Sequence, residues 1–128
     1  MVQMEYVKTD RAPSPVACYS QAVRAGDFLF VAGQVPLDPE TKKLVEGGIE
    51  AQAKRALENV KAIVEAAGSS LEKVVKVTIF LKDMKDFKKM NDVYCSYFLK
   101  DPPARTTVQA QLAVPELLIE IDAIACFT

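Results

Sequence analysis

The stretch LLIEIDAIACF, from Leu117 to Phe127, alternates with a period of two. One set of alternate positions is entirely apolar and comprises Leu117, Ile119, Ile121, Ala123, Ala125 and Phe127. The other set carries Glu120 and Asp122 among apolar neighbours. Because successive side chains of a β-strand point to opposite faces of the sheet, this stretch predicts a strand with one purely apolar face. The second face is nearly apolar as well, which indicates that both faces are covered.

Two stretches earlier in the chain also predict strands. VVKVTIFL, at Val74–Leu81, alternates so that Val75 and every second residue after it form an apolar face. ARTTVQAQL, at Ala104–Leu112, alternates between small or apolar residues and a polar face that includes Arg105 and Thr107.

The N-terminal third of the chain predicts a hairpin. In YSQAVRAGDFLFVAGQV, at Tyr19–Val35, β-prone runs flank a glycine-containing break at residues 25–27. FLFV, at Phe28–Val31, is apolar on both strand faces. Leu44 and Val45 could add a short edge strand after a polar turn.

Two helices are predicted. Apolar residues recur every three or four positions over Ile49–Ala67, and Gly68 supplies a C-terminal stop. Asp83 can cap a second helix, which Pro102 and Pro103 bring to an end. Its buried stripe is predicted to contain Met84, Phe87, Met90, Val93 or Tyr94, and Tyr97.

The order of these elements predicts an α+β fold: a single mixed sheet with two helices packed on one face, forming one domain over residues 1–128. Two helices can cover only one face of a sheet. The residues Phe28–Val31 and the last strand are apolar on both faces, so a second subunit is expected to cover the other face.

Composition excludes several classes of function. Sixteen basic and seventeen acidic residues leave a net charge of -1, so no overall field attracts nucleic acid or anionic membrane. Histidine is absent, which excludes Ser-His and Cys-His nucleophile pairs, zinc held by histidine and a histidine general base. The three cysteines have no C-x-x-C spacing and are predicted to be reduced thiols. With no leader pattern and no apolar run of spanning length, a cytoplasmic protein is expected.

Arg105 and Glu120 are the candidates for chemistry. An arginine at a strand start most often serves a surface ion pair. However, its planar guanidinium also suits bidentate binding of a carboxylate, and a glutamate among apolar residues must find a partner or a task. If the strand at Ala104–Leu112 paired as a simple hairpin with Leu117–Phe127, the two residues would lie about 17 Å apart. Either these strands are not simple neighbours, or the partners meet across an interface.

Several motifs of this chain resemble those of the Rid family of enamine/imine deaminases. They are Y-S-Q-A at Tyr19–Ala22, A-G-Q at Ala32–Gln34, N-V-K-A-I at Asn59–Ile63, V-V-K-V-T-I-F-L-K-D from Val74, P-A-R ending at Arg105, and I-E-I-D-A-I-A from Ile119. The similarity runs from about residue 10 to residue 125, in the family's order.

The resemblance implies a chorismate-mutase-like fold, homotrimers with clefts between subunits, and hydrolysis of 2-imino acids to 2-oxo acids and ammonia without metal or cofactor. It makes Arg105 the anchor of the substrate carboxylate and Glu120 the group that positions water. Tyr19, Gly33, Asn91 and Thr107 would line the cleft. By their sequence context alone, Tyr19 would be an ordinary strand residue and Asn91 a helix-surface amide. At Thr107, where the family archetype has a cysteine, the backbone N–H is expected to contact substrate.

The chain departs from the family pattern at three places. Ala17-Cys18 replaces a glycine-proline pair, Ala32 replaces the serine of S-G-Q, and VPELL from Val114 replaces a lysine-bearing loop before the last strand. These changes remove a hydroxyl and alter the cleft wall, so they bear on the choice of substrate rather than on the reaction class.

Three other functions stay open at this point. A chorismate-mutase-type site would also set arginine against carboxylates, but it would need more than one cation on this polar face. An RNA-directed, translation-inhibiting or chaperone role is described for relatives, and the near-neutral charge argues against it. A regulator could bind a 2-oxo acid in the same cleft without turnover.

Overall fold

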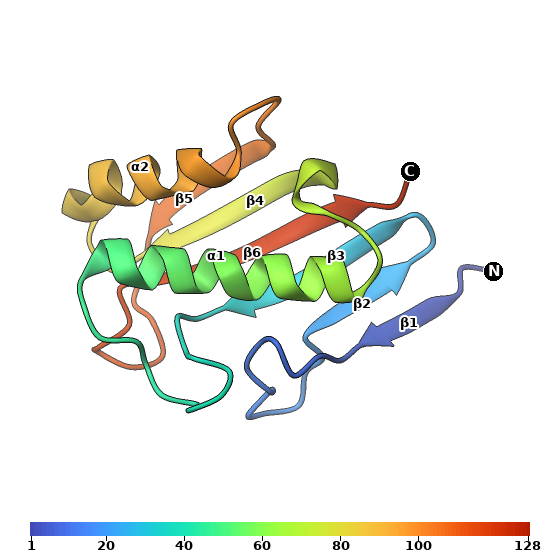
Figure 1. Cartoon of the computed structure of the whole chain (residues 1–128), viewed down its shortest axis with the longest axis horizontal. Helices are drawn as coiled ribbons and strands as arrows, with labels where there is room; N and C mark the ends of the chain where they lie inside the picture. The colour runs from blue at the N-terminus through green and yellow to red at the C-terminus, as the bar shows by residue number, and fades with distance from the viewer.

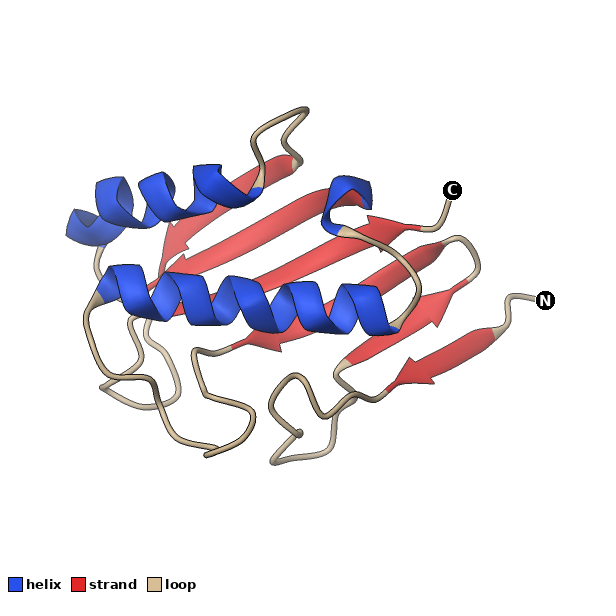
Figure 2. Ribbon diagram, viewed as in Figure 1, coloured by secondary structure: helices blue, strands red, loops and turns tan.

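The computed structural model describes all 128 residues and has the predicted α+β architecture. Helices α1 (Ile49–Ala66) and α2 (Phe87–Tyr97) lie on one face of a six-stranded sheet (Figure 1, Figure 2). The strands are β1 (Met4–Val7), β2 (Ala22–Ala25), β3 (Phe28–Gln34), β4 (Val74–Leu81), β5 (Ala104–Gln109) and β6 (Ile119–Cys126). Two short 3-10 turns, η1 (Leu71–Lys73) and η2 (Met84–Asp86), precede β4 and α2. We call the two sides of the sheet the helix face and the open face.

The stretch Leu117–Phe127 contains a strand at the centre of the sheet. The strand order is β1-β2-β3-β6-β4-β5, so β6 lies between β3 and β4 and pairs antiparallel with both. β4 and β5 pair in parallel, which makes the sheet mixed as predicted. On β6, Ile119, Ile121, Ala123 and Ala125 are at most 2 % exposed, so the predicted apolar face is confirmed.

α1 covers β3 and β6 with its apolar stripe. Leu57, Val60 and Ile63 are almost fully buried there. The helix ends just before Gly68, whose φ of +94° lies in the left-handed region that favours glycine. The predicted helix over Ile49–Ala67 is therefore confirmed. Neither helix of the chain has the length and hydrophobicity required to cross a bilayer.

α2 is shorter than the sequence predicts. The Asp83 carboxylate accepts a hydrogen bond of 2.9 Å from the backbone N–H of Lys85, so it caps η2 rather than α2. Met84 is 38 % exposed and lies outside the buried stripe, contrary to the prediction. Met90 and Tyr94 are the buried residues of α2.

β4 contains an irregularity that alternation alone does not reveal. Its register against β6 shifts between Val74 and Lys76, as in a β-bulge. Val74 is 5 % exposed and Val75 is 42 % exposed. The prediction that Val75 lies on the apolar face is therefore wrong, because the extra residue of the bulge reverses which side chain points to the core. The later positions Val77, Ile79 and Leu81 are buried as predicted.

The predictions for the edges of the sheet were less accurate. β1, which pairs with β2, was not predicted, and its side chains are mostly exposed and do not alternate. Leu44 makes only an isolated bridge with Leu37, so the edge strand proposed at Leu44 and Val45 is absent. β5 ends at Gln109 rather than at Leu112.

The open face carries exposed apolar side chains. Phe28 and Phe30 are each 47 % exposed, while Leu29 and Val31 between and beside them are buried under α1. The hairpin of β2 and β3 is confirmed, with Gly26 at φ +60° in its turn. The open face is thus as apolar along β3 as the sequence predicted.

The bulge in β4 predicts an unequal effect of two neighbouring substitutions. Val74→Ala should lower the free energy of unfolding by about 1–2 kcal/mol, because it removes buried methyl groups. Val75→Ala should change it by less than about 0.5 kcal/mol, as expected for an exposed position. Urea unfolding at one fixed protein concentration measures both. No measurable loss for Val74→Ala would contradict the bulge, because the bulge is what places Val74 in the core.

Candidate functional site

Arg105 and Glu120 point to opposite faces of the sheet. β4 lies between β5 and β6, so the two strands that carry them do not pair. Arg105 lies beside Val77 of β4, which is buried under the helices. Glu120 lies beside Phe80, whose neighbours along β4 are both buried on the helix face. Because paired residues share a face, Arg105 points to the helix face and Glu120 to the open face.

The two residues are also far apart along the sheet. Their partners Val77 and Phe80 are separated by about 10 Å of strand rise, and β4 adds two strand spacings, about 10 Å, between them. The simple hairpin considered from the sequence does not occur. The alternative, that these strands are not neighbours, is confirmed.

The six predicted site residues fall into two groups within one chain. The glutamate half comprises Tyr19, Gly33 and Glu120, which line one pocket. The arginine half comprises Asn91, Arg105 and Thr107, where α2 covers β5. None of the three ion pairs of the chain includes Arg105 or Glu120.

Gly33 makes room for the Glu120 carboxyl group. A Cβ placed on Gly33 would lie 2.8 Å from Glu120 Cδ, closer than real Cβ contacts. Gly33 falls in a register shift between Val31 and Gln34, where β3 departs from regular pairing with β6. A bulge beside a carboxylate is one way in which a sheet aims a functional side chain.

The electrostatics of Glu120 suit a proton acceptor. Burial raises the pKa of Glu120 above the ordinary range of a glutamate, and the nearby Asp122 carboxylate raises that pKa further. A carboxylate with a raised pKa binds a proton more readily than an exposed one.

The glutamate half opens on a pocket of about 720 Å³. Its walls come from three loops, residues 13–20, 35–48 and 110–118, which gather near the end of the sheet where β3 ends and β6 begins (Figure 1). The apolar lining includes Val16, Ala32, Leu37, Leu44, Val114 and Leu117.

A buried amide holds the first of these loops. Gln21, which is 2 % exposed, accepts a hydrogen bond of 2.7 Å from the backbone N–H of Thr9. Its Nε2 donates to the backbone oxygen of Pro13 at 2.9 Å. These bonds fix the segment that leads to Tyr19, a residue that is 49 % exposed.

A second buried amide holds the loop after β3. Asn59, on the buried side of α1, donates hydrogen bonds of 3.0 Å to the backbone oxygens of Val35 and Leu37. Its own Oδ1 accepts from the guanidinium of Arg55. Every polar atom of this buried side chain is therefore paired.

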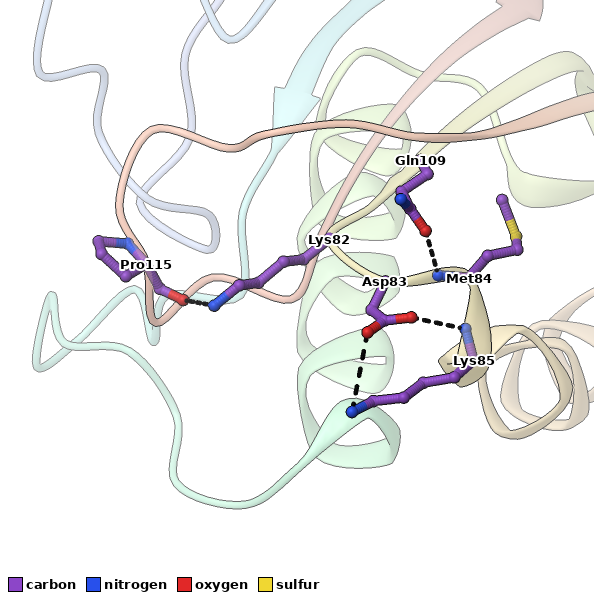
Figure 3. Close-up of polar contacts among 6 residues, drawn as sticks. All are labelled: Lys82, Asp83, Met84, Lys85, Gln109 and Pro115. Carbon is purple, nitrogen blue, oxygen red and sulfur yellow. Dashed lines mark hydrogen bonds and ion pairs between the residues drawn. The ribbon is translucent and has the colours of Figure 1, made fainter.

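The third loop is held from two sides. Gln52, which is 3 % exposed, donates to the backbone oxygen of Glu116 at 3.0 Å and accepts from the N–H of Leu118 at 2.8 Å. The Lys82 ammonium reaches across from the end of β4 to the backbone oxygen of Pro115 (Figure 3). The loop before β6 is thus tied to both α1 and β4.

The arginine half is ordered by α2. Arg105 Nη1 donates a hydrogen bond of 2.7 Å to Asn91 Oδ1. The guanidinium carbon lies 4.7 Å from the centre of the Tyr94 ring and 5.5 Å from that of Phe87. Cation–π contact with two rings and one hydrogen bond restrict the orientation of the guanidinium, while its other N–H groups have no partner in the chain.

Two hydroxyl groups in the arginine half are buried without a hydrogen-bond partner, Tyr94 OH and Thr107 Oγ1. Burial raises the pKa of Tyr94 to about 12, although the Arg105 charge acts in the opposite direction. The Tyr94 hydroxyl therefore remains neutral near pH 7.

The end of β5 is fixed as well, because Gln109 Oε1 accepts a hydrogen bond of 2.8 Å from the backbone N–H of Met84 (Figure 3).

Sequence reasoning missed Gln21, Gln52 and Asn59 as determinants of the site. A signal was available for two of them. Gln52 and Asn59 are seven residues apart in α1, which places them on one side of the helix next to its apolar stripe. A polar residue on a buried helix face requires a hydrogen-bond partner.

Comparison with known proteins relates the chain to one family. The family model for Endoribonuclease L-PSP matches residues 9–127. A RutC family protein of Pyrococcus horikoshii is 54 % identical over 121 residues, covering 94 % of this chain and 96 % of that protein. The crystal structure of RidA from an Antarctic Psychrobacter is 43 % identical with a TM-score of 0.89, covering 95 % and 98 % of the two chains. A structure of Escherichia coli TdcF with bound serine is 37 % identical with a TM-score of 0.92, covering 97 % and 99 %. The chain belongs to the Endoribonuclease L-PSP family, which includes the Rid and RutC proteins.

Proposed function

We propose that this protein hydrolyses 2-imino acids and their enamine tautomers, such as 2-iminopropanoate and 2-iminobutanoate, to 2-oxo acids and ammonia. The observation that carries the proposal is the complementary chemistry of the two halves. Arg105 has free guanidinium donors held in one orientation, and Glu120 is a half-buried carboxylate with a raised pKa. The kinship with RidA, and the serine bound to the similar TdcF, also favour a ligand of amino-acid type.

The proposed mechanism needs no group beyond these side chains and water. Arg105 binds the substrate carboxylate bidentately. Glu120 takes a proton from a water molecule as the water oxygen forms a bond to the imine carbon and the electron pair of the C=N bond moves to nitrogen. Glu120 then returns the proton to nitrogen. As the C–N bond breaks and ammonia leaves, the Glu120 carboxylate accepts the proton of the new hydroxyl group, so that the carbonyl forms. Fixed placement and acid/base catalysis suffice because an iminium carbon is already electrophilic.

We further propose that the catalytic site is shared between subunits of a homotrimer. Within one chain the two halves are on opposite faces of the sheet, so one small substrate cannot contact both. A second chain that covers the apolar open face would bring its own Arg105 to the glutamate half. The number three comes from the family resemblance alone.

The first test is direct. A threonine or serine dehydratase generates the 2-imino acid in solution, and the rate of 2-oxo acid release is followed with and without the protein. We expect a faster release with the protein present. Unchanged rates over several imines would refute the activity. Binding of 2-oxo acid without such acceleration would instead support a regulator.

Substitution of Arg105 tests the anchoring role. Both Arg105→Ala and Arg105→Lys should lose at least about 100-fold in kcat/KM, because lysine keeps the charge but cannot make the bidentate contact. Arg11→Lys, which alters an arginine of an exposed ion pair with Glu65, serves as the control and should leave the rate unchanged. A lysine variant at position 105 with wild-type turnover would contradict bidentate anchoring.

Glu120→Gln should lower kcat by about 10²- to 10⁴-fold while the affinity for a 2-oxo acid stays within a few-fold, since Glu120 acts on water. The ionised carboxylate is the active form, and its pKa is raised. The wild-type rate should therefore begin to fall on acidification at a higher pH than the ordinary glutamate pKa of about 4.3 implies. That limb of the pH profile should be missing in Glu120→Gln. An equal loss of ligand binding in the variant would indicate a structural role.

The shared site predicts complementation between two inactive variants. Refolding Arg105→Ala together with Glu120→Gln in equal amounts should restore about a quarter of wild-type activity, because one interface in four then combines two intact halves. A mixture of Arg105→Ala with Arg105→Lys is the control and should stay inactive. No recovery in the first mixture, or an active monomer by light scattering, would rule out the shared site.

A further inference from the structure

We propose that the pocket beside Glu120 receives the substrate side chain and selects imino acids with branched aliphatic side chains over small, hydroxylated or acidic ones. This inference rests on the proposed function. The pocket occupies about 720 Å³, and nine of its twelve lining residues are hydrophobic. A single chain thus leaves far more space beside Glu120 than a methyl group requires, and the apolar walls favour a hydrocarbon group.

The three substituents of the substrate indicate which group the pocket would receive. A 2-imino acid carries a carboxylate, a nitrogen and a side chain. Arg105 of another subunit takes the carboxylate, and Glu120 with its water must face the reacting carbon and the nitrogen. The side chain is then left to the space on the same side as Glu120, whose walls include Val16, Leu37 and Val114.

Two of the three places where this chain departs from the family pattern lie in that wall. Ala32 offers a methyl group in place of a serine hydroxyl, and Val114 and Leu117 belong to the VPELL segment that replaces a lysine-bearing loop. The charged residues among the lining are Glu116 and Glu120, both acidic. A second carboxylate on the substrate would meet like charge there and find no cation.

Hydrogen bonds hold the loops that form the pocket wall, so the pocket can distinguish substrates by the shape of their side chains. The backbone of the VPELL segment is bonded to the Gln52 side chain and to the Lys82 ammonium (Figure 3), and the facing loop is bonded to Asn59. A cavity whose loops are fixed by buried amides keeps its shape when empty, so an aliphatic group that fits it gains contacts at little ordering cost.

The test compares imines that differ only in side chain. An L-amino-acid oxidase, with catalase to remove peroxide, generates them from leucine, alanine, serine and glutamate. We expect kcat/KM for the leucine-derived imine to exceed that for the alanine-derived imine by about tenfold or more, and the glutamate-derived imine to be poorest. Equal values, or a preference for serine or glutamate, would overturn the inference while leaving the proposed function intact.

Two variants locate the selectivity in the pocket. Val114→Ser should lower the leucine-to-alanine ratio by about three- to tenfold. Leu99→Ser, at a residue that is 86 % exposed and does not line the pocket, should leave the ratio unchanged. An unchanged ratio in Val114→Ser would count against the pocket as the selective element.

Binding separates failure of the inference from failure of the proposed function. If no imine is turned over, the proposed function fails, and the affinities of the wild-type protein for 4-methyl-2-oxopentanoate and pyruvate then decide the question. Tighter binding of 4-methyl-2-oxopentanoate, by about tenfold, would support the pocket as an aliphatic site. Equal binding would overturn it.

Discussion

β4 lies between β5 and β6, and side chains alternate along each strand. Together these two constraints determine which face of the sheet carries each candidate catalytic residue. They send Arg105 under α2 and Glu120 to the open face. No side-chain rotation can bring the two groups together, because the sheet lies between them. The exposed apolar side chains of β3 favour a covering partner on the open face. The proposed shared site needs a second chain for another reason, namely that its two halves lie on opposite faces of one sheet. A single association would meet both needs.

Buried amides hold the backbones of the loops that surround the pocket. Loops at the end of a sheet carry backbone N–H and C=O groups that cannot be buried unpaired. Gln52 and Asn59 of α1, and Gln21 directly before β2, supply partners for these groups. Loss of one amide would leave a buried carbonyl or N–H without a partner, at a cost of about 1–3 kcal/mol. The loop backbones are therefore anchored to α1 and to the start of β2 by hydrogen bonds.

Much of the fold could be predicted because periodicity reports local structure. α1, the β2–β3 hairpin and the buried face of β6 follow from spacing alone. The bulge at Val74 and the position of β4 between β5 and β6 both result from pairing between segments that are distant in the sequence. Alternation within one strand carries no information on such pairing. Alternation showed that Arg105 and Thr107 share a face, but it could not show that α2 covers that face. The site residues beyond Arg105 and Glu120 came from the family resemblance, and the amides that hold the pocket loops were missed.

Each half of the proposed site is ordered within a single chain. Asn91 and Tyr94 restrict Arg105 within its own subunit, and Gly33 leaves the space that Glu120 occupies. Association of two such halves would not need to order the catalytic side chains, so little of its free energy would be lost to conformational entropy. Separation of the halves also keeps a cation and a carboxylate from neutralising each other inside one chain. Neither residue takes part in an internal ion pair, so both charges would be available to a substrate bound in the proposed shared site.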